Sequence, residues 1–225
     1  MKVRVKVKVM RYEFLVAGLP DLKQGTLLST EALTELLSEQ LSARDKQLWK
    51  SLTPDPSPEG EGSIDIVEKA ESSKNGFLRD WFSFNRDLNN ILTAAICRKH
   101  GLDLRKQIKV ESESESERLG VNSVAQQILA NPNAKDFGLT GTTPLVEEVL
   151  RIAAIENLLE RERAIDAIRQ AWLEERTMFD DFGIEKVLSY WLQNEILHRW
   201  DKLTMETGQR VFRELVNDMK KSIKI

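Results

Sequence analysis

The stretch that decides the fold runs from Phe77 to Ile108 and reads FLRDWFSFNRDLNNILTAAICRKHGLDLRKQI. With a rotation of about 100° per residue, large apolar side chains collect on one broad face, which predicts an amphipathic helix. Gly101 after His100 is a natural end for that helix. The predicted apolar face comprises Phe77, Leu78, Trp81, Phe84, Leu88, Ile91, Leu92, Ala95 and Ile96. The predicted polar face comprises Ser83, Arg86, Asp87, Asn90 and Arg98.

Two asparagines depart from this division into faces. Asn85 projects from within the apolar face, and Asn89 lies at its edge. An unpaired buried amide costs about 1–3 kcal/mol, so Asn85 should hydrogen-bond to a neighbouring segment if it is buried. Both asparagines are therefore candidates for a structural contact or a contact with a partner protein.

Length and composition indicate an ordinary globular protein. The chain has 225 residues, 41% of them hydrophobic and 31% charged, and a formal net charge of −3. This balance lacks the basic excess of a nucleic-acid-binding protein, and the single cysteine, Cys97, fits a reducing cytosol. No apolar run approaches the roughly 18 residues needed to cross a bilayer, and the N-terminus lacks the order of a signal peptide. We therefore expect a cytoplasmic protein that reaches a membrane only through other proteins.

The patterns favour a mainly α-helical bundle, one helical fold overall, with a short N-terminal strand. MKVRVKVKVM at Met1–Met10 alternates valine with basic residues, and it is either this strand or a leader that need not fold. TPDPSPEGEGS at Thr53–Ser63 and ESESESE at Glu111–Glu117 predict a linker and an acidic loop. The predicted parts are the strand and helices of residues 1–52, the linker of residues 53–76, and the main helical domain of residues 77–225, which contains the acidic loop 111–117.

Capping signals mark further helices. Ser29 or Thr30 begins one helix, and Thr143 with Pro144 begins another. Along this second helix the apolar face changes side, so the helix either breaks near Glu160–Arg163 or continues with different partners at its two ends. The predicted helices outside the central stretch span about residues 30–40, 42–49, 121–130, 145–175 and 184–200, with a last one from residue 204 onward.

The predicted helix from Ile184 to Trp200 is apolar on more than one side. Trp191 belongs to one apolar face, and Trp200 belongs to another together with Tyr190. Such a helix lies at the centre of its fold or completes a protein interface. Trp191 and Trp200 are therefore candidates for core or partner contacts.

Glu195 and His198 lie beside Trp191 on the same helix. We interpret them first as a satisfied polar pair at an interface. The alternative is the acid–base dyad of a small helical enzyme, which requires both side chains to converge in a water-accessible pocket.

The remaining residues give no pattern for a cofactor, a metal or a catalytic nucleophile. GLTGTT at Gly138–Thr143 has the glycines of a phosphate-binding loop but lacks its lysine, and a role in starting a helix explains it. Cys97 and His100 share a helix edge, but two ligands near a helix end make a poor metal site. Cys97 also falls on the predicted polar side, without a group to orient an activating base. We expect no catalytic residue, bound cofactor or metal.

Four segments carry a resemblance to a known family. They are YEFLVAGLPDL at Tyr12–Leu22, FNRDLNNILTAAICRKHGLDLRKQI at Phe84–Ile108, AKDFGL at Ala134–Leu139 and LVEEVLRIAAIENLLERERAIDAIRQAWLEE at Leu145–Glu175. In this order they resemble a bacterial family of uncharacterised proteins whose genes tend to lie among those for V-type (A/V-type) ATPase subunits. That family is similar in size and helical character to the C subunit of these rotary enzymes, called d in eukaryotes.

The resemblance implies a non-catalytic, C-like subunit of the central stalk, which would help couple ATP turnover to ion transport. The implied partners are the rotor shaft subunits and the membrane ring subunits. The implied location is the cytoplasmic side of the membrane, at its periphery through those partners. An assembly or regulatory factor of the same complex is the alternative. No motif identifies which residues would touch the ring.

Overall fold

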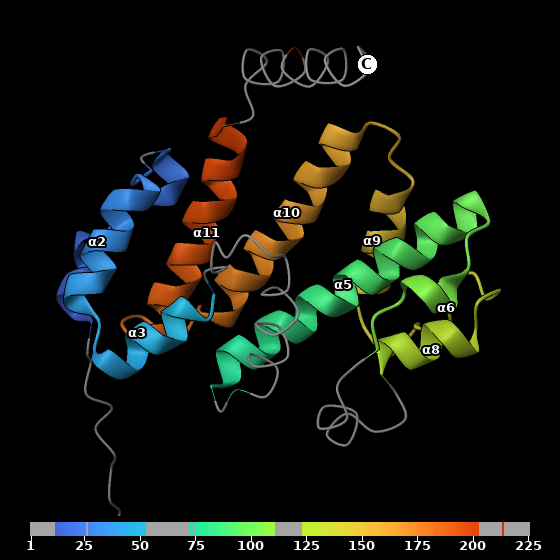
Figure 1. The fold of residues 1–225 in the computed structure, drawn as a ribbon, viewed down its shortest axis with the longest axis horizontal. Helices are drawn as coiled ribbons and strands as arrows, with labels where there is room; N and C mark the ends of the chain where they lie inside the picture. Colours follow the sequence, from blue (N-terminus) through green and yellow to red (C-terminus); the bar gives the residue numbers. More distant parts are fainter. Residues whose placement is uncertain are drawn as a thin grey trace, which may run out of the picture. The chain divides into compact units, whose positions relative to one another are not determined.

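The computed structural model describes residues 12–25, 27–52, 73, 75–110, 123–202 and 213 (Figure 1). Within these ranges it contains nine α-helices, one short 3-10 helix and no strand, which confirms the predicted helical fold. The predicted strand at Met1–Met10, the linker Thr53–Ser63, the acidic run Glu111–Glu117 and the last predicted helix, apart from Arg213, lie outside the described residues. Among the helices of the described ranges, none is long and apolar enough to span a bilayer.

The chain forms two compact units. Unit 1 consists of Met1–Ser42 and Leu173–Ile225, and unit 2 of Ala43–Trp172, so unit 1 is assembled from both ends of the sequence. Its described helices are α1 (Glu13–Gly18), η1 (Leu22–Gln24), α2 (Thr30–Gln40) and α11 (Ile184–Lys202). Those of unit 2 are α3 (Ala43–Lys50), α5 (Gly76–His100), α6 (Leu104–Gln107), α8 (Val124–Ala130) and α9 (Leu145–Ala153). Helix α10 (Leu158–Arg176) begins in unit 2 and ends in unit 1.

Helix α5 is the central element of unit 2 and contacts α6, α8 and α9 (Figure 1). The side chain of Asn75 caps its start by accepting a hydrogen bond from the Leu78 amide. Its predicted end is confirmed, because Gly101 adopts the left-handed conformation with φ of 66°.

The division of α5 into two faces is only partly right. Six residues of the predicted apolar face are buried, namely Phe77, Leu78, Trp81, Phe84, Leu88 and Ile91. However, Arg86, Asn90 and Cys97, which we expected on the polar side, are 8%, 2% and 2% exposed. The reason lies in the tertiary packing: neighbouring segments cover α5 on more than one side. A second strip of the helix is therefore buried as well.

Asn90 shows how a polar side chain in this second buried strip finds hydrogen-bond partners. Its Nδ2 donates to the Lys109 carbonyl at 2.8 Å, and its Oδ1 accepts from the Lys109 amide at 3.0 Å. One amide side chain therefore pairs with both backbone groups of a residue beyond the α5–α6 turn. This reciprocal pairing removes the cost of burying the asparagine.

Aromatic residues join α5 to α10 within unit 2. The ring of Trp172 lies with its centroid 6.0 Å from that of Phe77, 5.5 Å from Trp81 and 5.0 Å from Phe84. Such pairs contribute about 0.5–1.5 kcal/mol each beyond the burial of their area. They hold the unit 2 part of α10 against the first half of α5.

The predicted helix after Pro144 breaks, but earlier than expected. Helix α9 ends at Ala153, and α10 begins at Leu158, so the break lies before the Glu160–Arg163 stretch. Asn157 explains the new start, because its Oδ1 accepts hydrogen bonds from the amides of Leu159 and Glu160.

Helices α2 and α11 contact each other in unit 1. Ser29 caps α2 by accepting from the Ala32 amide, as its sequence position predicted. Several α11 side chains are buried, and they include polar as well as apolar ones: Val187, Leu188, Ser189, Trp191 and Asn194. Of the two roles predicted for α11, a central position in its own unit is the one these buried residues support.

Candidate functional site

The candidate residues fall into two groups on different units. Asn85 and Asn89 lie on α5 in unit 2, and the other four, Trp191, Glu195, His198 and Trp200, lie on α11 in unit 1.

Arg169 of α10 gathers the two asparagines of unit 2. Its Nε donates to Asn85 Oδ1 at 2.9 Å, and its Nη2 lies 3.4 Å from Asn89 Oδ1. Its Nη1 donates to Asp166 Oδ1 at 2.8 Å, forming an ion pair whose side chains are 17% and 4% exposed. Asn85 Nδ2 donates back to the Trp81 carbonyl. The hydrogen bond expected from Asn85 to a neighbouring segment is present, and it joins α5 to α10.

Arg169 was not among the site residues predicted from the sequence. A signal was available: Arg169 lies four residues after Ile165, which is buried, so the two side chains share one face of the helix. An arginine so placed needs several acceptors, because its guanidinium carries only donors. The exposed edge of this cluster, on Asn89, is the part that solvent or another molecule can reach.

On α11, polar side chains hold the start of α2. The Leu28 carbonyl accepts a hydrogen bond from Asn194 Nδ2 at 3.1 Å and a short one from His198 Nε2. Thr30 Oγ1 donates to Glu195 Oε1 at 3.0 Å. Donation to a carbonyl requires a hydrogen on His198 Nε2. Three side chains from two turns of α11 thus fix the entry into α2.

This arrangement argues against the interpretation of Glu195 and His198 as an acid–base dyad. Each side chain is bonded to a different group of the α2 start, and the His198 nitrogen in the contact acts as a donor. A dyad would require both side chains to leave these partners. The geometry therefore favours a polar pair that positions a segment.

The remaining α11 candidates have different surroundings. Trp191 is 4% exposed and belongs to the core, whereas Trp200 is half-buried near the end of the described helix. Tyr190 donates from its hydroxyl to the Pro20 carbonyl at 3.0 Å. Burial, with a smaller effect of the Asp21 carboxylate, raises the pKa of Tyr190 to about 12. The hydroxyl is therefore a fixed hydrogen-bond donor at neutral pH.

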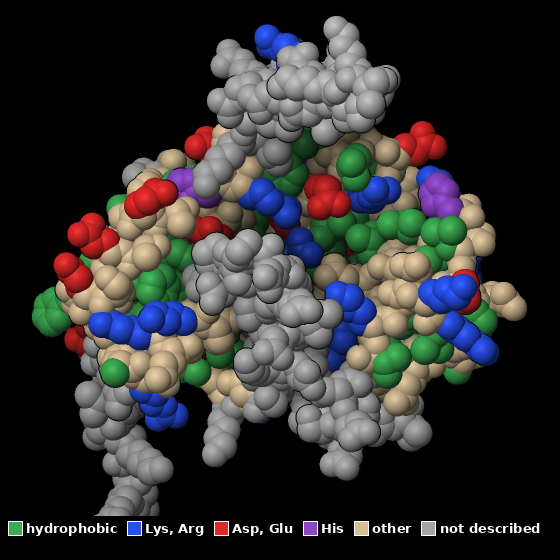
Figure 2. All heavy atoms as spheres, in the orientation of Figure 1, with side chains coloured by type: hydrophobic (Ala, Val, Ile, Leu, Met, Phe, Trp, Pro, Cys, Tyr) green, Lys and Arg blue, Asp and Glu red, His purple; other side chains and the backbone are tan. Residues whose placement is uncertain are grey.

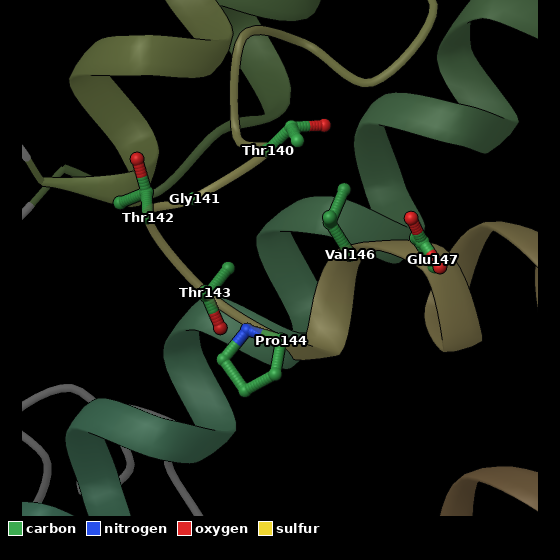
Figure 3. Close-up of a pocket in the computed structure, with 7 residues that line it drawn as sticks. All are labelled: Thr140, Gly141, Thr142, Thr143, Pro144, Val146 and Glu147. Atoms are coloured by element: carbon green, nitrogen blue, oxygen red, sulfur yellow. The ribbon is translucent and has the colours of Figure 1, made fainter.

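A hollow of about 460 Å³ lies where the Gly138–Thr143 loop meets α9. Figure 3 shows Thr140 and Thr142 on the loop and Val146 and Glu147 on the first turn of the helix. Thr143 Oγ1 accepts from the Leu145 amide, so the loop starts α9 as predicted. Among the residues that line this hollow only Glu147 is charged, and its carboxylate would repel a phosphate.

The loop before this hollow is held by its own side chains. The Asp136 carboxylate accepts hydrogen bonds from the Thr140 hydroxyl and from the amides of Thr140 and Gly138. These bonds, the hydroxyl first, lower the pKa of Asp136 to about 2. Arg98 lies with its guanidinium 3.7 Å from the centre of the buried Phe137 ring. Asp136 and Arg98 therefore already have structural roles.

Cys97 and His100 do not converge. Cys97 is buried in α5, whereas His100 is exposed at the end of the helix. In the part of the chain that the structure describes, no group of at least three histidine, cysteine or carboxylate residues is placed to hold a metal ion.

A family model described as "Protein of unknown function (DUF2764)" matches residues 59–223. The chain belongs to this family. The match covers α5 to α11 and leaves α1 to α3 outside it. No curated protein and no solved structure matches the chain. The likeness to the C subunit and the link to V-type ATPases therefore stay predictions.

Both polar clusters of this DUF2764 protein have members inside the matched region. Arg169 with Asn85 and Asn89 lies wholly within it, whereas the α11 cluster reaches back to Leu28 and Thr30, which precede it. The structure thus assigns the candidate polar residues to joints between segments.

Proposed function

We propose that this DUF2764 protein is a non-catalytic component of a V-type ATPase. In this proposal it is a C-like, or d-like, subunit of the central stalk, on the cytoplasmic side of the membrane ring. The observation that carries the proposal is the order of the four resembling segments along the chain, from Tyr12–Leu22 to Leu145–Glu175. The description of the DUF2764 family names no function, so the support comes from that resemblance and from the physical argument below.

A stalk subunit transmits torque, so its helices must not slide past one another under load. Side-chain bonds between segments meet this requirement better than apolar contact alone, because hydrogen bonds depend on direction. Here Arg169 ties α10 to α5, and Asn90 ties α5 to the segment after α6. Asn194 and His198 tie α11 to the segment before α2.

The surface also suits contact with proteins. On the face seen in Figure 2, acidic and basic side chains lie among apolar ones over the described atoms. Protein–protein interfaces are about as apolar as the rest of a protein surface, so a mixed surface of this kind can form one. In this proposal the partners are the rotor shaft subunits and the subunits of the membrane ring.

The test is co-purification from the native host. The full-length chain is tagged, the membranes are extracted in a mild detergent, and recovered proteins are identified and counted by mass spectrometry. We expect the shaft and ring subunits to be recovered with one copy of this protein per mature rotor. Recovery of neither would reject the proposal. Recovery only with incomplete complexes would instead assign the protein as an assembly factor.

A further inference from the structure

The turn between α10 and α11 exposes two large apolar side chains. Phe179 is 91% exposed and the adjacent Met178 is 59% exposed. Phenylalanine and methionine are among the residues enriched at protein interfaces. We call this pair the Phe179 tip.

The turn that carries the tip is held in place from both sides. Thr177 is 1% exposed, and its hydroxyl donates to the Leu173 carbonyl at 2.8 Å. The Asp180 amide donates to the Thr177 carbonyl at 3.2 Å, and the Asp180 carboxylate accepts from the Gly183 amide at 3.0 Å. The residues that flank Met178 and Phe179 are therefore anchored, and the tip points away from an ordered turn. A partner would meet a preorganised anchor, which lowers the entropy lost on binding.

Acidic residues flank the tip in the sequence. Between Glu174 and Asp181 the sequence EERTMFDD has four carboxylates and one basic residue, Arg176. Glu174 pairs with Lys23 at 3.3 Å, and Arg176 lies 3.9 Å from Glu185, so these two basic side chains are already engaged by acids. Glu175 and Asp181 are exposed. The rim around the apolar tip is therefore negative.

We propose that the Phe179 tip anchors a docking surface for a basic segment with an apolar face, carried by another protein. The aromatic ring would fill a hydrophobic recess in that segment, in the way that buried aromatic anchors dominate interfaces. The acidic rim would pair with lysine or arginine around the recess and would reject acidic partners. This inference concerns one surface of unit 1 and does not depend on which complex contains the protein.

The test is site-specific photocrosslinking in the native host. The photoreactive residue p-benzoylphenylalanine replaces Phe179 in the full-length tagged chain, and cross-linked peptides are sequenced by mass spectrometry. The matched control places the same residue at Leu158, which is 60% exposed at the start of α10. We expect position 179, and not position 158, to capture a peptide of another protein in which lysine and arginine outnumber acidic residues. Capture of an acidic or neutral peptide, of this chain's own Met1–Met10 segment or of a second copy would overturn the inference, and so would the absence of a cross-link.

Substitutions then measure how much the Phe179 tip and its acidic neighbours contribute to binding affinity. A synthetic peptide with the captured sequence is titrated against the full-length protein, and binding is followed by fluorescence anisotropy. Phe179→Ala should weaken binding at least tenfold, and Glu175→Gln with Asp181→Asn should weaken it severalfold and reduce its dependence on salt. Circular dichroism should show unchanged folding, because all three side chains are exposed. Unchanged affinity in both variants would refute the docking surface.

The inference and the proposed function can fail separately. Co-purification of the rotor without a cross-link at position 179 rejects the docking surface and leaves the stalk proposal intact. A basic peptide captured from a protein outside the rotary ATPase, with no rotor subunit recovered, supports the docking surface and rejects the stalk.

Discussion

At the scale of single residues, Arg169 joins both candidate side chains of unit 2. Its guanidinium reaches Asn85, Asn89 and Asp166 together, across two helices of unit 2. An arginine suits this position because its five donors are fixed in one plane, whereas a lysine has one flexible ammonium group. Arg169→Lys would therefore keep only some of these hydrogen bonds.

Arg169→Met should lower the free energy of unfolding by about 3 kcal/mol. This is the lower end of the cost of breaking a buried ion pair, because the Arg169 side chain keeps 17% exposure. Urea denaturation followed by circular dichroism measures the change. The control is Arg151→Met, whose pair with Glu148 is long, at 4.0 Å, and exposed, so it should cost less than about 1 kcal/mol. Equal losses in the two variants would contradict a special role for Arg169.

Asp136 should make stability depend on pH in the acid range. Its pKa is lowered from 3.8 to about 2 in the folded protein, so the unfolded chain binds the proton more readily. The stabilising contribution is present above about pH 4 and is lost as the pH falls through 2. Asp136→Asn removes the titrating group. The difference in unfolding free energy between wild type and variant, measured in urea from pH 7 to pH 2, should narrow below pH 4. A difference that stays constant would contradict the assignment.

At the scale of helices, what could be predicted from the sequence was set by local chemistry. Ser29 and Gly101 mark helix ends because a cap depends on the nearest few residues. The burial of Asn90 and Cys97 could not be predicted, because it depends on which segments cover the second side of α5. The break before α10 had a local signal in Asn157, which caps the new helix. The break was instead predicted at the charged residues Glu160–Arg163, which lie inside α10.

Asn157→Ala should therefore destabilise the first turn of α10. Loss of an N-cap costs about 0.5–2 kcal/mol, whereas replacement by glycine costs only a few tenths. Hydrogen exchange read by mass spectrometry should show faster exchange over Leu158–Arg161 in the alanine variant. Asn157→Gly serves as the control and should change exchange much less. Identical exchange in both variants would show that tertiary packing, and not the cap, fixes this helix start.

At the scale of the whole molecule, the division into two units could not be predicted from the sequence patterns. Unit 1 combines Met1–Ser42 with Leu173–Ile225, and nothing local links these distant segments. The same limit applies to the candidate site. Glu195 and His198 were recognised as polar residues on an apolar helix, but their partners at Leu28 and Thr30 lie more than 160 residues away in the chain.

If the two units are compact on their own, damage to one core should remain in that unit. Leu188→Ala in unit 1 and Ile128→Ala in unit 2 each remove a side chain that is 0% exposed, at a cost of about 2–5 kcal/mol. Hydrogen exchange should then rise in α2 and α11 for Leu188→Ala, and in α5 and α8 for Ile128→Ala. The two variants serve as controls for each other, because they remove similar volumes. If either substitution raises exchange equally in both units, the protein unfolds as one cooperative body.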